Sequence, residues 1–158
     1  MNHIYTIEEL KRKRLEFKEQ NKKVVFTNGC FDILHPGHVD YLNKSKEAGD
    51  ILIVAINSDD SVRRLKGNKR PILSLSERAF IIGNLRAVDF VTFFEEDTPE
   101  ETIKALIPDI LIKGEDWDID KIVGKDIVEE HGGEVKRIKF VSNRSTSDII
   151  STILERYK

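Results

Sequence analysis

Strand-like and helix-like segments alternate along almost the whole chain. Short apolar runs predict strands at residues 24–27, 51–56, 90–94, 110–113 and 134–140. Amphipathic or capped segments predict helices at 37–48, 59–65, 75–86, 99–106, 119–131 and 146–156. This alternation is typical of a parallel sheet with helices on both faces. We therefore predict an α/β fold built on a doubly wound, five-stranded parallel sheet.

The length of the chain limits it to one domain of ordinary size. Its 158 residues are enough for one hydrophobic core and too few for two typical domains. Thr6 and Glu9 form a capping-box pattern, which opens a charged helix ending near Gln20. We expect residues 1–22 to form a helical leader packed on the core, and residues 23–158 to form the main domain.

The charge and cysteine content exclude several classes of protein. Lys and Arg number 26 against 28 acidic residues, a net charge of −2, so a long polyanion such as DNA is not expected as a partner. A phosphate ligand would need a local positive cluster. The single cysteine excludes an intrachain disulfide, and no signal peptide or membrane-spanning stretch is apparent. We expect a cytoplasmic protein with no membrane partner.

The segment 26–38, with sequence FTNGCFDILHPGH, carries the strongest functional signal. His35 and His38 flank a Pro-Gly pair between the end of the first predicted strand and the start of a helix. A helix amino terminus offers unpaired N–H groups and a partial positive charge, so anions bind there. Gly29 and Gly37 allow a ligand to approach the backbone closely. The segment therefore predicts a phosphate-binding turn.

Two other interpretations of these histidines are open. His35 could be a helix cap and His38 a packed side chain. Alternatively the two histidines could bind zinc together with Cys30 and Asp32. The zinc interpretation is weakened because the other histidines, at positions 3 and 131, lack ligand spacing and the chain has no cysteine pair.

The same turn resembles the HxGH motif of the nucleotidyltransferase superfamily, which includes the cytidylyltransferases. Within that superfamily, the chain is most similar to the D-glycero-D-manno-heptose 1-phosphate adenylyltransferase domain of ADP-heptose synthesis. The likeness covers nearly the whole chain and includes residues 29–32, 35–42, 57–59, 65–67, 70–71, 95–99 and 113–117. The resemblance implies a Rossmann-like fold. The sequence has no Walker A motif and no glycine motif of the dinucleotide-binding type.

The resemblance implies the transfer of AMP from ATP to a sugar 1-phosphate, with release of pyrophosphate. Mg²⁺ is expected to accompany ATP, and no metal site formed by the protein alone is expected. The implied catalytic residues are His35, His38, Lys46 and Arg78. For Lys46 the alternative is a solvated lysine, and for Arg78 an ion pair with a nearby acid.

Further residues are implied to bind the two substrates. The nucleotide-binding candidates are Thr27, Asn28, Gly29, Cys30, Phe31, Gly37, Lys113, Gly114, Asp116, Ser145, Thr146 and Ser147. The candidates for sugar or ribose hydroxyls are Asp32, Asp59 and Trp117, and Asp32 could alternatively orient local amides. Residues 144–147 resemble a second motif of the family, and the alternative is simple N-capping by Ser145 or Thr146. Trp117 could equally be a packing residue.

A basic segment with Lys66, Lys69 and Arg70 could close over a substrate, or could be a surface turn. The resemblance also implies a homodimer and, because no kinase domain accompanies the motif, a stand-alone transferase. Two alternative functions remain open. One is a cytidylyltransferase acting on glycerol 3-phosphate or a similar alcohol phosphate. The other is a noncatalytic nucleotide-binding module.

Overall fold

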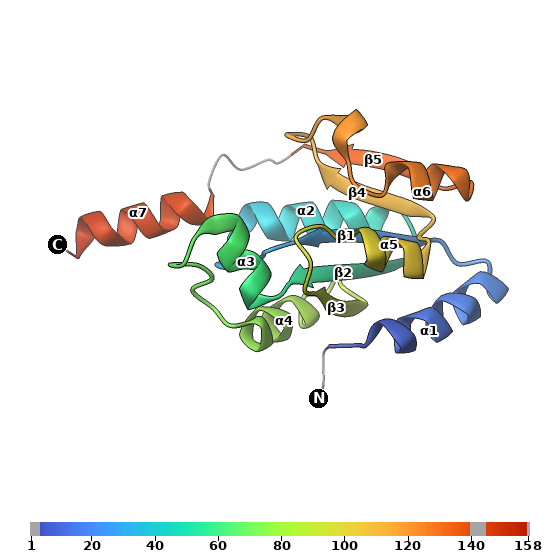
Figure 1. Ribbon diagram of the computed structural model, residues 1–158, viewed down its shortest axis with the longest axis horizontal. Helices are drawn as coiled ribbons and strands as arrows, with labels where there is room; N and C mark the ends of the chain where they lie inside the picture. The colour runs from blue at the N-terminus through green and yellow to red at the C-terminus, as the bar shows by residue number, and fades with distance from the viewer. Residues whose placement is uncertain (1–3, 140–144, 158) are drawn as a thin grey trace.

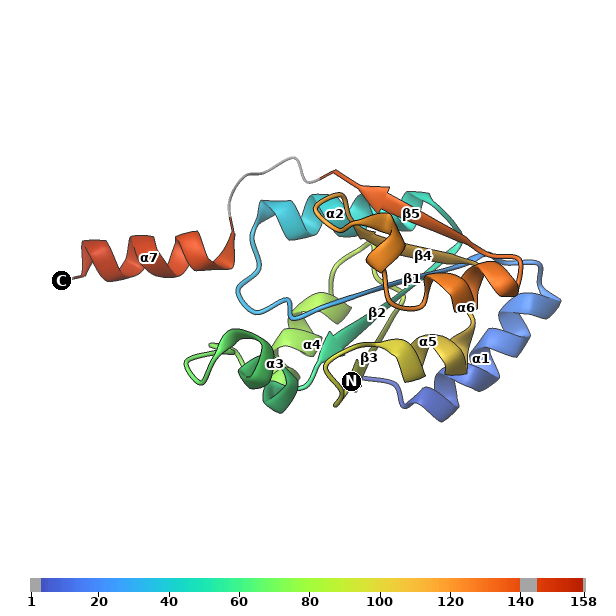
Figure 2. The ribbon, with the colours of Figure 1, turned by 45° about the horizontal axis from the view of Figure 1, so that its top comes forward.

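The computed structural model describes residues 4–139 and 145–157, and its centre is a five-stranded parallel sheet (Figures 1 and 2). The strands lie in the order β3-β2-β1-β4-β5. Their bounds are β1 Val24–Gly29, β2 Ile51–Asn57, β3 Phe90–Phe94, β4 Ile110–Gly114 and β5 Glu134–Ile138. The predicted α/β class and the doubly wound, Rossmann-like sheet are confirmed.

Helices fill the connections between the strands, as predicted. Their bounds are α1 Ile7–Glu19, α2 Pro36–Glu47, α3 Asp59–Lys66, α4 Leu75–Gly83, α5 Glu100–Leu106, α6 Lys125–Glu130 and α7 Thr146–Arg156. The single helix predicted for 119–131 is wrong. A 3-10 turn, Ile119–Lys121, is separated from α6 because Gly124 adopts a left-handed conformation with φ 89°.

Helices cover both faces of the sheet, so the strand residues are buried on both sides. On one face, Val25, Leu52 and Val54 pack with side chains of α2 and α4. On the other, Phe26 and Ile53 pack with side chains of α1, α5 and α6. The alternation of neighbouring strand residues between these two cores follows from the two-residue period of a strand.

The N-terminal helix α1 packs on the second of these faces. Leu10 is fully buried, and the Arg14 guanidinium donates to the carbonyl of Ile107 and, at 2.8 Å, to the Asp109 carboxylate. The N–H of Tyr5 donates to the Val91 carbonyl at 2.8 Å, at the outer edge of β3. The leader is therefore joined to the sheet by apolar and polar contacts.

The strand order reverses between β1 and β4, which lie side by side and continue outward in opposite chain order. Open sheets bind ligands beyond the carboxyl ends of the strands at such a reversal. β1 extends to Gly29, two residues further than the predicted strand, and therefore carries Asn28 to this edge. Helix α7 extends away from the sheet in both views (Figures 1 and 2). None of the helices in the described ranges is long and apolar enough to cross a membrane.

Candidate active site

A cavity of about 490 Å³ opens at the carboxyl ends of β1 and β4, where the strand order reverses. Thirteen of the predicted site residues line it, which are Asn28, Gly29, Cys30, Phe31, Asp32, His38, Lys113, Gly114, Asp116, Trp117, Ser145, Thr146 and Ser147. Residues from the first, fourth and last βα connections are therefore brought together, although the first and last of these connections lie more than 100 positions apart in the sequence.

The two histidines lie at the start of α2, where His35 occupies the N-cap position without a side-chain cap hydrogen bond. Their rings stack, with centroids 3.9 Å apart, and the Phe31 ring packs edge-on against His38 at 5.4 Å. His38 lines the cavity, whereas His35 lines a shallow depression outside it. Of the two histidines, His38 therefore lies in the cavity, and His35 supports the His38 ring from outside it.

Burial and the neighbouring His35 lower the pKa of His38 to about 4. His38 is therefore neutral at physiological pH, and a neutral imidazole donates from only one nitrogen. Its Nδ1 is buried and makes no hydrogen bond within residues 4–139 and 145–157. His38 thus has hydrogen-bonding capacity that the described protein groups do not use.

Lys113 lies at the end of β4 and is 7% exposed. Its ammonium donates to the Asn28 side-chain oxygen and lies 5.4 Å from the centre of the Trp117 ring. Burial lowers the pKa of Lys113 to about 8, against an opposing effect of Asp116. A half-exposed indole, a carboxylate and a buried cation therefore form one end of the cavity.

Asp32 is held by three donors rather than facing the cavity freely. Its carboxylate accepts from the Arg70 Nε at 2.5 Å and from the N–H groups of Ile72 and Leu73 at 2.9 Å. Burial alone would raise the pKa of Asp32, but these two N–H groups and Arg70 outweigh it, so the pKa is lowered. Asp32 therefore ties the β1–α2 turn to the segment before α4, and the alternative that it orients local amides is observed. Its role with sugar hydroxyls stays a prediction.

The start of α7 closes another side of the cavity. Ser145 caps the helix by accepting from the Asp148 N–H at 3.2 Å, and Thr146 donates to the Ile33 carbonyl at 3.1 Å. The capping interpretation of Ser145 is confirmed, and residues 145–147 also line the cavity. Position 144 of the predicted motif lies outside the described residues.

Arg78 is 1% exposed and lies beneath the turn instead of lining the cavity. Its guanidinium donates to the carbonyls of Leu73 and Cys30 and, at 2.6 Å, to the Asp59 carboxylate. The alternative of an ion pair is therefore observed. Arg78 and Asp59 do not line the cavity, and their roles toward substrate stay predictions.

Thr27 and Gly37 also lie behind the cavity wall. The Thr27 hydroxyl lies 2.7 Å from the Tyr41 hydroxyl and donates to the Ile112 carbonyl at 3.0 Å, which ties α2 to β4. Gly37 is buried in the first turn of α2. Neither residue is in the lining of the cavity, and their contacts with nucleotide stay predictions.

The structure places Lys46, a predicted catalytic residue, far from the cavity. It lies near the end of α2, where its ammonium contacts the Asp89 carboxylate at 2.5 Å and the Asp50 carbonyl, both beside the amino ends of strands. Lys46 follows His38 by eight residues, and a helix rises about 1.5 Å per residue, so about 12 Å separates them along the axis. Lys46 is at the wrong edge of the sheet to reach the cavity.

The cavity is also lined by residues outside the predicted site. Lys66 and Arg70 belong to the basic segment that could close over a substrate or form a surface turn. Asn57 ends the second strand, a position that could have identified it. The remaining additions are Tyr41, Leu65, Asp97, Thr98, Pro99 and Val123. No group of three or more His, Cys, Asp or Glu side chains within the described ranges is arranged to hold a metal ion.

The sheet and the position of the cavity define an open α/β protein with its ligand site at the strand reversal. The cytidylyltransferase-like family model matches residues 26–156, and the chain belongs to this family. The predicted membership of the nucleotidyltransferase superfamily is thereby confirmed.

Several relatives are proteins named bifunctional protein HldE. That of Citrifermentans bemidjiense is 56% identical over 87% of this chain, and that of Hahella chejuensis is 50% identical over 94%. The chain spans only 28% and 31% of these two relatives.

Two solved structures share the fold. The lipopolysaccharide core biosynthesis protein of Thermoplasma volcanium has a TM-score of 0.63 and 31% identity, covering 78% of this chain and 99% of that one. Pantoate-beta-alanine ligase of Francisella tularensis has a TM-score of 0.61 over 90% of this chain and 67% of that one, and its 18% identity supports likeness of fold alone.

Proposed function

We propose that this protein is a nucleotidyltransferase that transfers AMP from ATP to a sugar 1-phosphate, with D-glycero-D-manno-heptose 1-phosphate as the preferred acceptor. The products are the ADP-sugar and pyrophosphate. The proposal is supported by membership of the cytidylyltransferase-like family and by the HldE relatives. The similarity of its motifs to heptose 1-phosphate adenylyltransferases supports the choice of acceptor.

The observation that carries the proposal is the convergence of three phosphate-binding elements on one cavity. These elements are the histidine turn with His38, the buried ammonium of Lys113 and the start of α7 at Ser145–Ser147. Phosphoryl and nucleotidyl transfers depend mainly on positioning and on neutralising charge in the transition state. The residues that line this cavity can position the substrates and neutralise their charge, and the reaction needs no nucleophile from the protein.

In the proposed reaction, an oxygen of the acceptor phosphate attacks the α-phosphorus of ATP and pyrophosphate leaves. His38 donates a hydrogen bond to an α-phosphoryl oxygen, and its stacking on His35 and contact with Phe31 fix the ring. Lys113 provides positive charge to the triphosphate. Because phosphate-monoester oxygens are ionised near neutral pH, the acceptor needs no general base.

Mg²⁺ would enter with ATP, bound mainly to phosphate oxygens and water. The cavity offers such an ion an oxygen ligand in the Asn57 side-chain amide, which lies in its lining and is of a kind that suits Mg²⁺. When bound, the ion would neutralise charge on the phosphates.

A matrix of triphosphates and acceptors tests the proposed function. Pyrophosphate release is measured for ATP and CTP, each with heptose 1-phosphate, other sugar 1-phosphates and glycerol 3-phosphate. We expect turnover with ATP and heptose 1-phosphate, and its loss in His38→Ala. Turnover with CTP and glycerol 3-phosphate would instead identify a cytidylyltransferase. ATP binding without any product would identify a noncatalytic nucleotide-binding module.

We further propose that the protein acts as a homodimer in the cytoplasm, where ATP is available. Support for self-association comes from α7, which extends from the sheet and exposes Ile153, Leu154 and Tyr157 by 48%, 58% and 87%. Contiguous exposed apolar side chains are typical of interaction surfaces. Light scattering after size exclusion should give twice the 18.2 kDa chain mass, and Leu154→Glu should reduce it to that of one chain.

A further inference from the structure

We propose that Arg70, held in place by Asp32, binds the phosphate of the sugar-phosphate acceptor. Through this contact Arg70 selects acceptors that carry a phosphate group. This inference rests on the proposed function and adds to it the residue that recognises the second substrate. It assigns the two substrates to opposite ends of the cavity.

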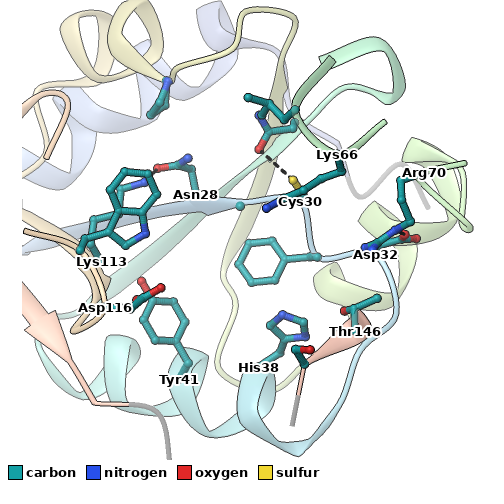
Figure 3. A pocket seen from close by; sticks show the side chains of 18 of the residues that line it. Asn28, Cys30, Asp32, His38, Tyr41, Lys66, Arg70, Lys113, Asp116 and Thr146 are labelled. Atoms are coloured by element: carbon teal, nitrogen blue, oxygen red, sulfur yellow. Dashed lines mark hydrogen bonds and ion pairs between the residues drawn. The ribbon is translucent and has the colours of Figure 1, made fainter. Parts of the chain in front are cut away.

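The two ends of the cavity differ in chemistry. Figure 3 shows Lys113 and Asp116 on one side, Lys66, Asp32 and Arg70 on the other, and His38 between them. The first side also has the exposed indole of Trp117. An aromatic face and a carboxylate suit a base and ribose hydroxyls, because the ring can stack on the base and the carboxylate accepts from hydroxyls. The second side is left for the acceptor.

Arg70 is held in a fixed orientation at the second side. Its side chain is 15% exposed, and its Nε donates to the Asp32 carboxylate, whose own side chain is fully buried. The same carboxylate accepts from the N–H groups of Ile72 and Leu73, so it cannot move without leaving those groups unpaired.

The terminal nitrogens of Arg70 make no hydrogen bond within residues 4–139 and 145–157. Arg70 therefore presents a pair of donors on a cation that is already oriented. A planar guanidinium of this kind suits phosphate, because it can donate two parallel hydrogen bonds to phosphate oxygens.

The charges at this end also favour a phosphate monoester. Asp32 neutralises one of the two cations, Arg70 and Lys66, and Lys66 makes no ion pair within the described part of the chain. Asp97, the other acidic residue near this end, is itself paired with Arg64 at 2.7 Å. One uncompensated positive charge therefore remains where a dianionic phosphate would bind.

This placement is consistent with the reaction. For in-line transfer, the oxygen of an acceptor phosphate held by Arg70 approaches the α-phosphorus from the side opposite the leaving pyrophosphate. A bond forms from the acceptor oxygen to the α-phosphorus, the bond from the α-phosphorus to the α–β bridging oxygen breaks, and the electron pair leaves with pyrophosphate. No oxidant, reductant or additional proton acceptor is needed.

The test is to measure binding of each substrate separately in Arg70→Gln. Calorimetry would measure heptose 1-phosphate binding in the presence of α,β-methylene ATP, and ATP binding alone. We expect the Kd for the sugar phosphate to rise about tenfold to a hundredfold, because charge-assisted hydrogen bonds are lost, and the Kd for ATP to change less than about threefold. Arg70→Lys, which keeps the charge, should give an intermediate loss. Arg63→Gln, an exposed residue on α3 outside the cavity lining, is the matched control.

An increase in the Kd for ATP with unchanged sugar-phosphate binding would overturn the inference and assign Arg70 to the triphosphate. Unchanged binding of both substrates in folded Arg70→Gln would also overturn it. If wild-type protein binds the sugar phosphate but transfers no AMP to it, the proposed function fails while the binding data still decide the role of Arg70. If wild-type protein binds no sugar phosphate at all, both fail. Urea unfolding of each variant verifies folding, and Arg70→Lys replaces Arg70→Gln if the latter is unfolded.

Discussion

At the scale of single residues, the site depends on titratable side chains removed from water. His38 is kept neutral by burial, and Lys113 is a buried cation whose hydrogen-bonding partner is the neutral side chain of Asn28. Burying a charge is costly unless it is compensated, so a site that keeps a buried ammonium is suited to an anionic ligand. The function of these residues can therefore be tested through their charge.

Replacing His38 by alanine should reduce turnover far more than it reduces stability. Removal of one preorganised donor to a developing charge typically costs about 3 kcal/mol, or on the order of a hundredfold to a thousandfold in kcat. The partly exposed ring contributes to a stacking contact rather than to either apolar core. Steady-state pyrophosphate release and urea unfolding measure the two effects. A loss of activity that parallels a loss of folded protein would contradict the assignment.

ATP binding should weaken as the pH rises through about 8, because Lys113 loses its positive charge there. The folded-state pKa is lower than the ordinary value of 10.5, so between about pH 8 and 10.5 the unfolded chain binds the additional proton. Stability attributable to Lys113 should therefore rise with pH in that window while affinity for ATP falls. In Lys113→Gln both dependences should be lost. Titration calorimetry and urea unfolding at pH 7, 8 and 9 separate them, and an ATP affinity that is constant across this range in wild type would refute the prediction.

At the scale of the elements, the cavity wall is held together by two arginines, Arg70 between α3 and α4 and Arg78 within α4. Arg78 joins the start of α4 to the β1–α2 turn and to the first residue of α3, and Arg70 joins the preceding segment to Asp32. These contacts link elements that are distant in sequence. The shape of the site therefore depends on buried polar contacts as well as on the apolar core.

Arg78→Gln should lower the free energy of unfolding by about 1 to 3 kcal/mol, because it leaves the partly buried Cys30 carbonyl and Asp59 carboxylate without their donor. Arg63→Gln, which removes only an exposed pair with Asp60, should change it by less than about 0.5 kcal/mol. Urea denaturation of both variants makes the comparison. Equal effects of the two substitutions would show that Arg78 does not have the proposed structural role.

At the scale of the whole molecule, the parallel sheet separates two edges with different roles. The carboxyl ends of the strands carry the cavity, and the amino ends carry the Lys46–Asp89 ion pair and the loops that return the chain to each strand. Because all strands run in the same direction, a helix that connects two of them begins at the carboxyl ends of the strands and finishes at their amino ends. The two ends of such a helix therefore lie at opposite edges of the sheet. Proximity in sequence to the histidine turn is therefore a poor guide to membership of the site.

Lys46→Gln should accordingly leave kcat and both KM values within about threefold of wild type. Its pair with Asp89 is about one-third exposed on each side chain, so its loss should cost about 1 kcal/mol or less of stability. Pyrophosphate release with wild-type and variant protein is the measurement. A hundredfold loss of turnover in a folded variant would reinstate Lys46 as a catalytic residue.

Much of the fold could be read from local sequence. Strand and helix periodicity depends on neighbouring residues, so the strands and most helices were predicted to within a few positions. The error at 119–131 arose because Gly124 adopts a left-handed conformation that ends the local helix, which a periodic pattern does not reveal. The histidine turn was also identified from sequence, because its residue types and spacing are local features.

The remaining assignments depended on contacts between distant segments. Strand order brings β4 beside β1, and only this places Lys113 next to Asn28, 85 residues earlier. The rise of α2 carries Lys46 away from the cavity, and tertiary packing pairs Asp32 with Arg70 and Arg78 with Asp59. Local patterns specify the elements and one turn because short-range sterics and periodicity create them. The composition of the site is specified by long-range packing, which decides which side chains share a space and which neutralise each other.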